Sequence, residues 1–361
     1  MRIGIAARGL DGRGGVKQYI ESLISAFLKI DKENEYYFFY NSPEFIGKYP
    51  EANEIVLNSS SKMFWDYYLL PKAAKKYNID VMLFPKNVLP FFIKCKSLIV
   101  IHDLAYYMAE LNAYPLIDRI YMRLMINSSV NRANHIIAVS ENTKKDIIKF
   151  TGARYDKITV IHEASDKKYG IINNETDLNR IRHKYSLSHK FILSHYSLSP
   201  RKNIKRLLIA FNSLNHKIPH ELVLVGGGSF NSKIENNLNN NSDSKVVNLG
   251  YVEDEDMPIL YNLADLFVYP SLYEGFGLPP LEAMACGCPV ISSNTSSLPE
   301  VVGDASSMID PYNIEELAKT IYDVLTDNML REDKIRKGLE RKKLFSWEKC
   351  AEEYLKIFKD V

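Results

Sequence analysis

The 361-residue sequence contains no apolar run of the roughly 18 residues that a membrane-spanning helix needs. Its first seven residues have the pattern of a strand, without the apolar core of a signal peptide. The eight histidines show no ligand spacing, and the cysteines match neither metal-site nor redox spacing. These absences predict a cytoplasmic protein with reduced thiols and no metal site. The cysteines are Cys95, Cys286, Cys288 and Cys350.

A strong charge of either sign is also absent. The formal net charge is +2, with 25% charged and 46% hydrophobic residues, as in soluble globular proteins. We therefore expect no nucleic-acid partner. Residues 1–165 carry 22 Lys/Arg and 17 Asp/Glu, a balance of +5, whereas the remainder has a balance of −3. This asymmetry is compatible with an anionic membrane or substrate near the first half, and ordinary solvated surface charge accounts for it as well.

Short β-branched or aromatic runs alternate with helical patterns along the whole chain. The runs are almost continuously apolar, which is typical of parallel strands buried on both faces. Intervening helices such as 16–30 and 202–214 then predict doubly wound α/β sheets. After Gly303 the chain is predicted to be helical to its end. The predicted strands are 2–7, 36–40, 81–84, 97–102, 135–139, 159–162, 191–195, 221–225, 246–250, 266–269 and 289–292.

The length suits two domains better than one core. The polar stretch 166–177 is the predicted boundary, and the Asn-rich run 236–244 is predicted to be a surface loop. An amphipathic helix follows Trp347 near the end of the chain. Its periodicity alone leaves open which domain it packs against.

Two motifs of the first half follow predicted strands. Gly12-Arg-Gly-Gly15 would form the first βα turn of a doubly wound sheet, where ligands bind. It is not the dinucleotide fingerprint, and a plain glycine turn is the alternative. His102-Asp103 ends a strand at the same edge. His102 would therefore either bond a substrate or be a buried structural histidine.

Ser199-Pro-Arg-Lys-Asn203 follows the first strand of the second half and is predicted to begin a helix. Arg201 and Lys202 at a helix N-terminus oppose the helix dipole unless an anion lies between them. This conflict predicts a diphosphate site, and a solvated basic turn is the alternative.

Two further segments lie at predicted strand ends. Glycines 226–228 and Leu249-Gly250-Tyr251 would lie where a base can be held by backbone groups, or they are ordinary turns. Asp254 and Asp256 have the D-x-D spacing of a metal site. They precede a predicted helix, where acidic residues are favoured by the dipole, so we expect no metal there.

The segment Glu274-Gly-Phe-Gly-Leu-Pro-Pro-Leu-Glu282 places two carboxylates on either side of a glycine-rich turn that begins a helix. Gly275 and Gly277 allow a tight turn, and a helix tolerates prolines in its first turn. Helix-start amides suit a phosphate. We expect Glu274 and Glu282 to bind hydroxyl groups on either side of a nucleotide sugar. Acidic residues at an ordinary helix start are the alternative.

With these motifs assembled, the chain resembles the retaining glycosyltransferases of family 4, which have the α/β GT-B fold. The likeness covers residues 12–15, Ile101-His-Asp-Leu104, Val139-Ser-Glu141, Ser199-Pro-Arg-Lys-Asn203 and Leu272-Tyr-Glu-Gly-Phe-Gly-Leu278 through Val290. The two glutamates match the family's E-x7-E signature. Within the family, the chain looks closest to mannosyltransferases that assemble bacterial O-antigen or capsule glycans.

The resemblance implies two Rossmann-like domains facing a central cleft. Residues 1–165 with 345–361 would form the acceptor-side domain, and residues 166–344 the donor domain. The donor would be a GDP- or UDP-linked sugar, with no cofactor and no metal. The acceptor would be a glycan or a lipid-linked saccharide.

The resemblance also implies roles for single residues. Arg201 and Lys202 would bind the diphosphate, Glu274 the transferred sugar and Glu282 the ribose. His102 would bond the sugar and help to stabilise positive charge near its anomeric centre. The remaining donor-binding residues would be Gly14, Gly15, Phe276, Gly277, Leu278, Gly250 and Tyr251.

One residue departs from the family pattern. Many relatives have a glycine where Tyr196 stands, and a side chain there would narrow the cleft or shift the loop.

Two points stay open at this stage. A nucleotide-sugar epimerase, a sugar phosphorylase or a non-catalytic nucleotide-sugar-binding protein would use the same fold. Residues 114–131 carry Ile120, Tyr121, Leu124 and Met125 with Arg119, Arg123 and Arg132 nearby. This pattern fits a basic amphipathic helix at a membrane surface, or a helix packed inside the first domain, which we expect.

Overall fold

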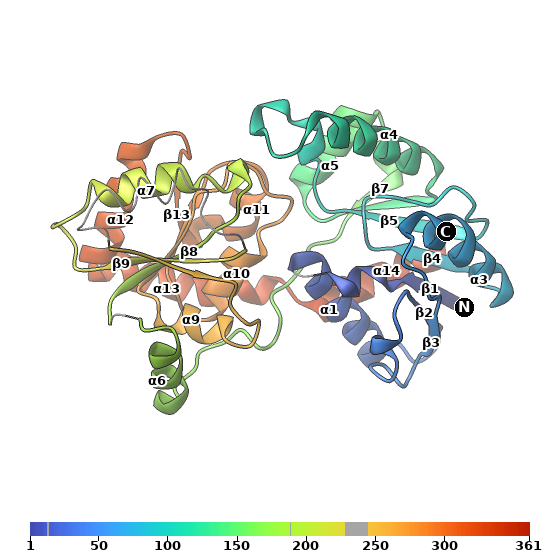
Figure 1. Ribbon diagram of the computed structural model, residues 1–361, viewed down its shortest axis with the longest axis horizontal. Helices are drawn as coiled ribbons and strands as arrows, with labels where there is room; N and C mark the ends of the chain where they lie inside the picture. Colours follow the sequence, from blue (N-terminus) through green and yellow to red (C-terminus); the bar gives the residue numbers. More distant parts are fainter. Residues whose placement is uncertain (13, 188, 228–244) are drawn as a thin grey trace. The chain divides into compact units, whose positions relative to one another are not determined.

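The computed structural model describes residues 1–361 except 13, 188 and 228–244. The described chain forms two compact units (Figure 1). Unit 1 comprises Met1–Met108, Tyr114–Ala164 and Phe345–Val361, and unit 2 comprises Ala109–Ala113 and Ser165–Leu344. Gly228 and the predicted loop 236–244 lie outside the described residues.

Unit 1 contains a seven-stranded parallel sheet in the order β3-β2-β1-β4-β5-β6-β7. Its core consists largely of apolar strand residues, which explains the continuous apolar runs. The strands are β1 (Arg2–Ala6), β2 (Glu35–Tyr40), β3 (Asn53–Val56), β4 (Val81–Phe84), β5 (Lys96–Ile101), β6 (His135–Ala138) and β7 (Ile158–Val160).

Helices cover both faces of this sheet (Figure 1). One core cluster joins α3, α4 and α5 to strand residues such as Phe39 and Met82. On the other face Phe27 of α1 stacks on Tyr36, and α14 packs against α1. The helices are α1 (Gly15–Ile30), α2 (Lys62–Phe64), α3 (Leu70–Lys76), α4 (Leu116–Arg132), α5 (Glu141–Thr151) and α14 (Trp347–Asp360).

Unit 2 contains a six-stranded parallel sheet in the order β10-β9-β8-β11-β12-β13. A core cluster joins α7 and α12 to the sheet. The strands are β8 (Phe191–His195), β9 (Glu221–Val225), β10 (Val246–Gly250), β11 (Leu266–Tyr269), β12 (Val290–Ser293) and β13 (Ser306–Ile309). The helices are α6 (Glu175–Lys184), α7 (Ile204–Asn212), α9 (Met257–Leu263), α10 (Leu278–Ala285), α11 (Leu298–Val302), α12 (Ile314–Thr326) and α13 (Asn328–Arg341).

The strand order of each sheet reverses beside its first strand. Chain order runs outward in one direction from β1 to β3 and in the other from β4 to β7, and unit 2 repeats the pattern from β8. Ligands of doubly wound sheets bind at this switch point, beyond the carboxyl ends of the strands. The motifs predicted to bind ligands follow β1, β5, β8, β9, β10 and β11. The topology therefore brings them to the ligand-binding edges of their sheets.

The prediction of an all-helical chain after Gly303 is wrong, because β13 pairs with β12. Its sequence, Ser-Ser-Met-Ile, is short and half polar, so it lacks the apolar run of the other strands. The hydroxyl of Ser306 lies 3.0 Å from that of Ser292, which satisfies both polar groups inside the sheet. The edge strand β3 was also not predicted.

Tyr196 faces the interior of unit 2. Its side chain is buried in the core cluster with Ile192, Ile204 and Leu207, so it does not narrow a ligand site as the sequence comparison suggested. Its backbone lies directly against Gly226, whose φ of 141° side chains rarely adopt. A Cβ on Gly226 would lie 2.0 Å from the carbonyl oxygen of Tyr196. Gly226 is therefore required by a close backbone approach.

Candidate active site

Lys202 and Glu274 form a buried ion pair at the switch point of unit 2. The Lys202 Nζ atom lies 2.8 Å from Glu274 Oε1, and Arg201 Nη1 lies 3.7 Å from Glu274 Oε2. Lys202 also donates to the hydroxyl of Tyr269, the last residue of β11. Glu274 is only 7% exposed. Burial raises the pKa of Glu274, but the two cations outweigh it and hold that pKa at about 2.

The anion between the two basic residues is thus a carboxylate of the protein itself. Contrary to the prediction, Arg201 and Lys202 do not begin α7. They lie in a 3-10 turn (Pro200–Lys202) before it. Asn203 then adopts a left-handed conformation with φ 59°, and α7 begins at Ile204. The predicted conflict with the helix dipole is therefore reduced. A bound diphosphate would compete with Glu274 for the same two cations.

Backbone contacts tie this turn to the loop that carries Glu274. Leu272 donates its N–H to the Arg201 carbonyl at 2.7 Å. The Ser297 hydroxyl lies 2.9 Å from the Glu274 carbonyl and 2.6 Å from that of Phe276. The basic turn and the glutamate loop are therefore held together by the fold as well as by their charges.

Glu282 lies one turn inside α10 and is 4% exposed. The Tyr261 hydroxyl lies 3.4 Å from Glu282 Oε2 and 2.8 Å from Nε2 of His195, the last residue of β8. Burial, aided by the positive Lys202, lowers the pKa of His195 to about 3, so its ring is neutral. Because a hydroxyl has one proton, Tyr261 donates to Glu282 when it accepts from the N–H of His195.

The first turn of α10 presents backbone amides selectively. Gly277 precedes the helix with φ 124°, and a Cβ there would lie 2.9 Å from Leu298. Pro279 and Pro280 have no N–H, so the amides at this helix start come from Leu278 and the residues before it. The turn fits the predicted phosphate contact of Phe276, Gly277 and Leu278 in its backbone geometry.

Two predicted residues of unit 2 lie at the end of β10. Gly250 has φ 65°, and its carbonyl accepts the N–H of Gly226 at 2.7 Å. Tyr251 follows it with an exposed side chain. Both therefore lie at the carboxyl edge of the sheet that carries Lys202.

Asp256 belongs to a different contact. Lys184 approaches its carboxylate at 2.5 Å and the Tyr185 hydroxyl at 2.7 Å, so the side chain joins α6 to the start of α9. Among the residues that the structure describes, no three His, Cys, Asp or Glu side chains gather closely enough to hold a metal ion.

His102 lies at the end of β5 in unit 1 and is mostly buried. Its Nδ1 is 3.1 Å from Glu163 Oε1, and its Nε2 is 3.1 Å from the Pro85 carbonyl oxygen. Both partners are hydrogen-bond acceptors, which favours the doubly protonated ring. Burial lowers the pKa of His102, but Glu163 outweighs it, so that pKa is raised above its usual value of 6.5.

Replacing Glu163 with glutamine is expected to move the pKa of His102 from above 6.5 to below it, because burial then dominates. In the wild type, the raised pKa stabilises the fold below pH 6.5, and this contribution is lost as pH rises through the folded-state value. Titration of the ring signals by NMR measures the shift. His135, whose pKa burial lowers, is the internal control. An unchanged His102 midpoint would contradict the assignment of Glu163 as its partner.

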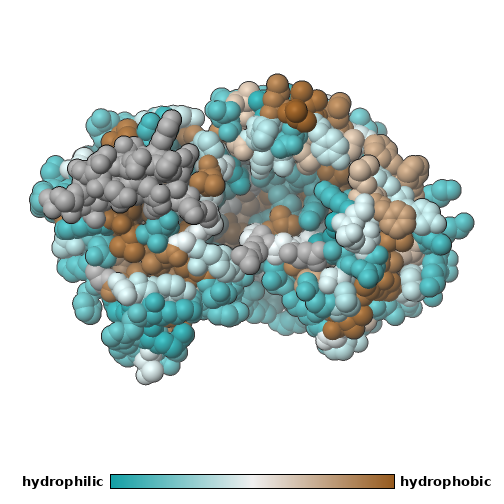
Figure 2. Space-filling view, viewed as in Figure 1, coloured by the Kyte–Doolittle hydropathy of each residue, from teal (hydrophilic) through white to brown (hydrophobic). Residues whose placement is uncertain are grey.

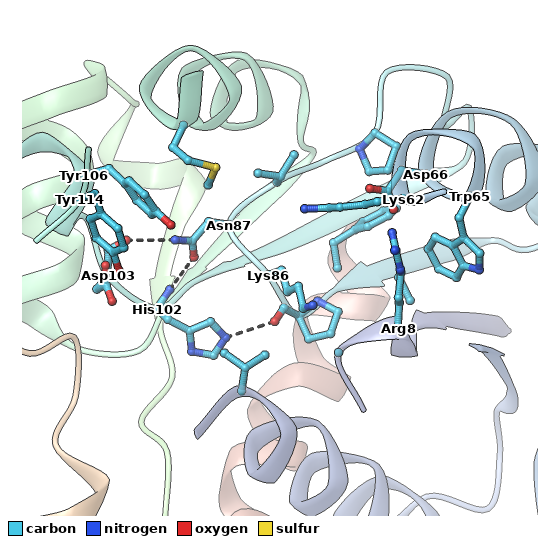
Figure 3. Close-up of a pocket in the computed structure, with 18 residues that line it drawn as sticks. Arg8, Lys62, Trp65, Asp66, Lys86, Asn87, His102, Asp103, Tyr106 and Tyr114 are labelled. Carbon is cyan, nitrogen blue, oxygen red and sulfur yellow. Dashed lines mark hydrogen bonds between the residues drawn. The ribbon is translucent and has the colours of Figure 1, made fainter. Parts of the chain in front are cut away.

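A pocket of about 270 Å³ lies beside His102, within unit 1 (Figure 3). It is lined from the carboxyl ends of β1, β4 and β5, by Gly9, Lys86 and Asp103 among others. Gly14 caps α1 with φ 82°, and no described atom lies within 4 Å of a Cβ placed on it or on Gly15. The backbone at this helix start is therefore uncovered in unit 1.

Sequence reasoning missed three site residues: His195, Tyr261 and Tyr269. His195 and Tyr269 each end a parallel strand, which is the same signal that identifies His102. Tyr261 lies inside α9, where its pattern is that of an ordinary core residue.

The chain matches two families over most of its length. Residues 13–168 match Glycosyltransferase Family 4, and residues 176–341 match Glycosyl transferases group 1. It is 34% identical over 293 residues to O-antigen chain mannosyltransferase B of Escherichia coli, covering 80% of this chain and 76% of that protein. It is 34% identical over 227 residues to the serotype-specific mannosyltransferase WbdA of Escherichia coli, of which it spans 28%.

A solved structure extends the similarity to the whole fold. HepE of Anabaena, solved in complex with UDP-glucose, has a TM-score of 0.80 and covers 100% of both chains at 18% identity. Each unit of the present chain has the Rossmann-like parallel sheet of the GT-B fold. The chain therefore belongs to the glycosyltransferases of family 4.

Proposed function

We propose that this glycosyltransferase moves a sugar from a nucleotide diphosphate sugar to a hydroxyl of a glycan or lipid-linked acceptor during cell-surface polysaccharide synthesis. The observation that carries the proposal is the buried cluster of Arg201, Lys202 and Glu274 at the switch point of unit 2. Similarity to O-antigen chain mannosyltransferase B supports mannose as the sugar. We propose GDP as the nucleotide, with UDP-sugars as the alternative.

Each donor group has a proposed partner in unit 2. Arg201 and Lys202 bind the diphosphate, joined by the amides before Pro279. Glu274 binds hydroxyls of the sugar and Glu282 those of the ribose. Gly250 and Tyr251 lie beside the base. On binding, the diphosphate replaces part of the charge that Glu274 now supplies to Lys202, which frees one carboxylate oxygen for a sugar hydroxyl.

We propose that transfer retains the anomeric configuration and needs no metal. The bond between the anomeric carbon and the diphosphate oxygen breaks while the acceptor oxygen bonds to the same face of that carbon. The acceptor proton passes to the departing phosphate. Arg201 and Lys202 stabilise the developing negative charge. Glu274, held ionised against two cations, is a weak nucleophile, which disfavours a covalent intermediate.

The test is transfer from GDP-mannose and from UDP-glucose to a panel of saccharide acceptors, with and without EDTA. We expect product with the donor's anomeric configuration, read from the NMR coupling at C1, and equal rates with EDTA. An inverted product or an EDTA-sensitive rate would overturn the mechanism. Donor converted to an isomer without acceptor would instead indicate an epimerase, and nucleotide binding without turnover a binding protein.

We further propose that unit 1 contacts an anionic membrane surface. Ten large apolar side chains of unit 1 are exposed. They belong to α2, to the turn after it, to the loop before β5, and to α4, and Figure 2 shows apolar surface over α4. Contacts join these elements: Tyr67 lies 5.7 Å from the Phe91 ring and 3.9 Å from Met125 Sδ. This apolar patch consists of Met63, Phe64, Tyr68, Phe91, Phe92, Leu116, Ile117, Ile120, Tyr121 and Leu124.

Charge and topology support this surface. Residues 62–132 carry ten Lys/Arg against five Asp/Glu, which is the whole basic excess of residues 1–165. The arginines of α4 do not form the basic face that the surface-helix alternative required, because Arg123 and Arg132 donate to carbonyls of adjoining loops. Met122, Ile126 and Val130 of α4 pack against the core of unit 1, as expected of a packed helix, while the other large apolar side chains of its first two turns are exposed. No described helix has the length and hydropathy to cross a membrane.

Replacing both Ile117 and Leu124 with serine is expected to lower the fraction that sediments with anionic liposomes several-fold. Each residue loses apolar area that inserts at the interface. Ile117 is 80% exposed, so folding should be little affected. Met329→Ser is the matched control, since Met329 is 84% exposed but lies on α13 of unit 2. Equal sedimentation of all three proteins, or no effect of salt on the wild type, would refute the proposal.

A further inference from the structure

The pocket of unit 1 has a basic end that the donor chemistry does not use. Arg8 follows β1, Lys86 follows β4, and Lys62 begins α2; all three line the pocket (Figure 3). Asp66 lines the same end. Burial raises the pKa of its carboxyl, and the charges of Lys62, Arg8 and Lys86 partly offset that rise. Three cations therefore converge on one partly buried carboxylate.

Arg8 is incompletely satisfied. Its Nη1 atom is buried and has no hydrogen-bond partner among the residues that the structure describes. Its guanidinium lies 5.9 Å from the ring centre of Trp65, which supplies no acceptor. A buried guanidinium N–H without an acceptor is costly, since charged groups lose water that nothing replaces. The site therefore favours an incoming anion.

Among the described residues that line this end, three are cations and Asp66 is a carboxylate. Asp103 lies at the other end, where its carboxylate accepts the N–H of Ala105 at 3.0 Å. A phosphate carries about −1.5 to −2 charge at neutral pH, so it suits an end lined mainly by cations.

The other end of the pocket is aromatic. Tyr106 and Tyr114 stack with ring centres 4.0 Å apart, and Asn87 holds the loop by donating to the Asp103 carbonyl at 3.1 Å. Stacked rings with polar hydroxyls suit a sugar, which also has apolar and polar faces. The volume, about 270 Å³, lies just below the roughly 300–1,000 Å³ typical of ligand pockets. It suits one sugar ring with a phosphate.

We propose that this pocket binds the phosphate of a phosphorylated acceptor saccharide, with Arg8, Lys62 and Lys86 on the phosphate and the Tyr106–Tyr114 pair against the sugar ring. The proposal rests on the proposed function, because it names the chemistry of the acceptor. Both a lipid-linked sugar phosphate and a soluble one carry the group that the pocket recognises.

Binding to the full chain tests the pocket without transfer. Mannose 1-phosphate and the neutral methyl mannoside are titrated by calorimetry with GDP and UDP present in excess, so that Arg201 and Lys202 are occupied. We expect the phosphate to bind at least about tenfold more tightly than the neutral sugar. Arg8→Gln and Lys62→Gln should each weaken phosphate binding about tenfold or more. Lys75→Gln, exposed on the nearby α3, should leave it unchanged.

The Asp66→Asn variant is expected to change the affinity for phosphate in the opposite direction. Removing a carboxylate on which three cations act should tighten phosphate binding several-fold, whereas a purely structural Asp66 would make the variant bind more weakly. Equal affinity for the two sugars, unchanged binding by Arg8→Gln, or weaker binding by Asp66→Asn would overturn the proposal.

Transfer to the two sources of phosphate then separates them. A lipid-linked sugar phosphate in vesicles and a soluble sugar phosphate are compared as acceptors, each against its phosphate-free analogue. A rate that depends on phosphate in either arm supports the pocket, and the arm with the higher rate identifies the source; no dependence in both overturns it. The proposed function is tested separately by measuring the slow hydrolysis of the donor without acceptor. This hydrolysis should be abolished by Lys202→Met whether or not the pocket binds a phosphate.

Discussion

Lys202→Met is expected to lower the transfer rate by roughly 10²–10³-fold, the usual loss when one donor that stabilises a developing anion is removed. Lys202 lies 2.8 Å from Glu274, and its loss removes one of the two cations proposed to bind the leaving diphosphate. The rate constant at saturating donor measures this effect. Lys205→Met is a control on α7, where the exposed side chain should be silent.

The same substitution should also destabilise unit 2. Glu274 would keep one distant cation, Arg201 at 3.7 Å, while remaining buried. Removing one partner of a buried ion pair costs about 3–5 kcal/mol. The double variant Lys202→Met, Glu274→Gln should recover most of this stability but none of the activity. Urea unfolding of the four proteins gives the coupling, and additive losses would show that the pair does not interact.

Glu274 also predicts a pH dependence. Its folded-state pKa of about 2 lies below the ordinary 4.5, so the carboxylate stabilises the fold above pH 4.5. This contribution disappears as pH falls from 4.5 towards 2. Glu274→Gln should therefore flatten the acid limb of the stability curve.

The parallel strands were predictable because burial on both faces leaves an apolar signature that needs no tertiary information. Val81–Phe84 and Phe191–His195 agree with the predicted residues. Ser306–Ile309 lacks that signature, and its serines are acceptable only because Ser292 and the Val290 carbonyl lie opposite. A strand whose polar groups are satisfied by its neighbour is not recognisable from its own residues.

The candidate site was predictable in position but not in pairing. Residues at strand ends were identified because topology alone brings them to one edge. That Lys202 would meet Glu274 depends on the loops after β8 and β11, which the sequence pattern does not describe. For the same reason, the sequence pattern predicted only a bound ligand as the anion between Arg201 and Lys202, and not the carboxylate of Glu274. The link from His195 through Tyr261 to Glu282 is likewise a tertiary contact.

The second large effect is expected at Gly226. An alanine at this position must adopt φ 141°, which costs about 1–3 kcal/mol. Its Cβ would lie 2.0 Å from the Tyr196 carbonyl oxygen, and the backbone shift that relieves this contact costs about 1–3 kcal/mol more. We expect unit 2 to lose about 2–6 kcal/mol, or roughly 5–20 °C in melting temperature.

Donor binding should fall with it, because the displaced strand end leads into the turn that carries Arg201 and Lys202. Gly227→Ala is the matched control: no described atom lies within 4 Å of its Cβ, and its melting temperature should stay within a few degrees of the wild type. Thermal unfolding of both variants, with and without GDP, tests the argument. If Gly226→Ala melted like Gly227→Ala, the close approach of Tyr196 to Gly226 would not exist in solution, and the Arg201–Lys202 turn would need another support.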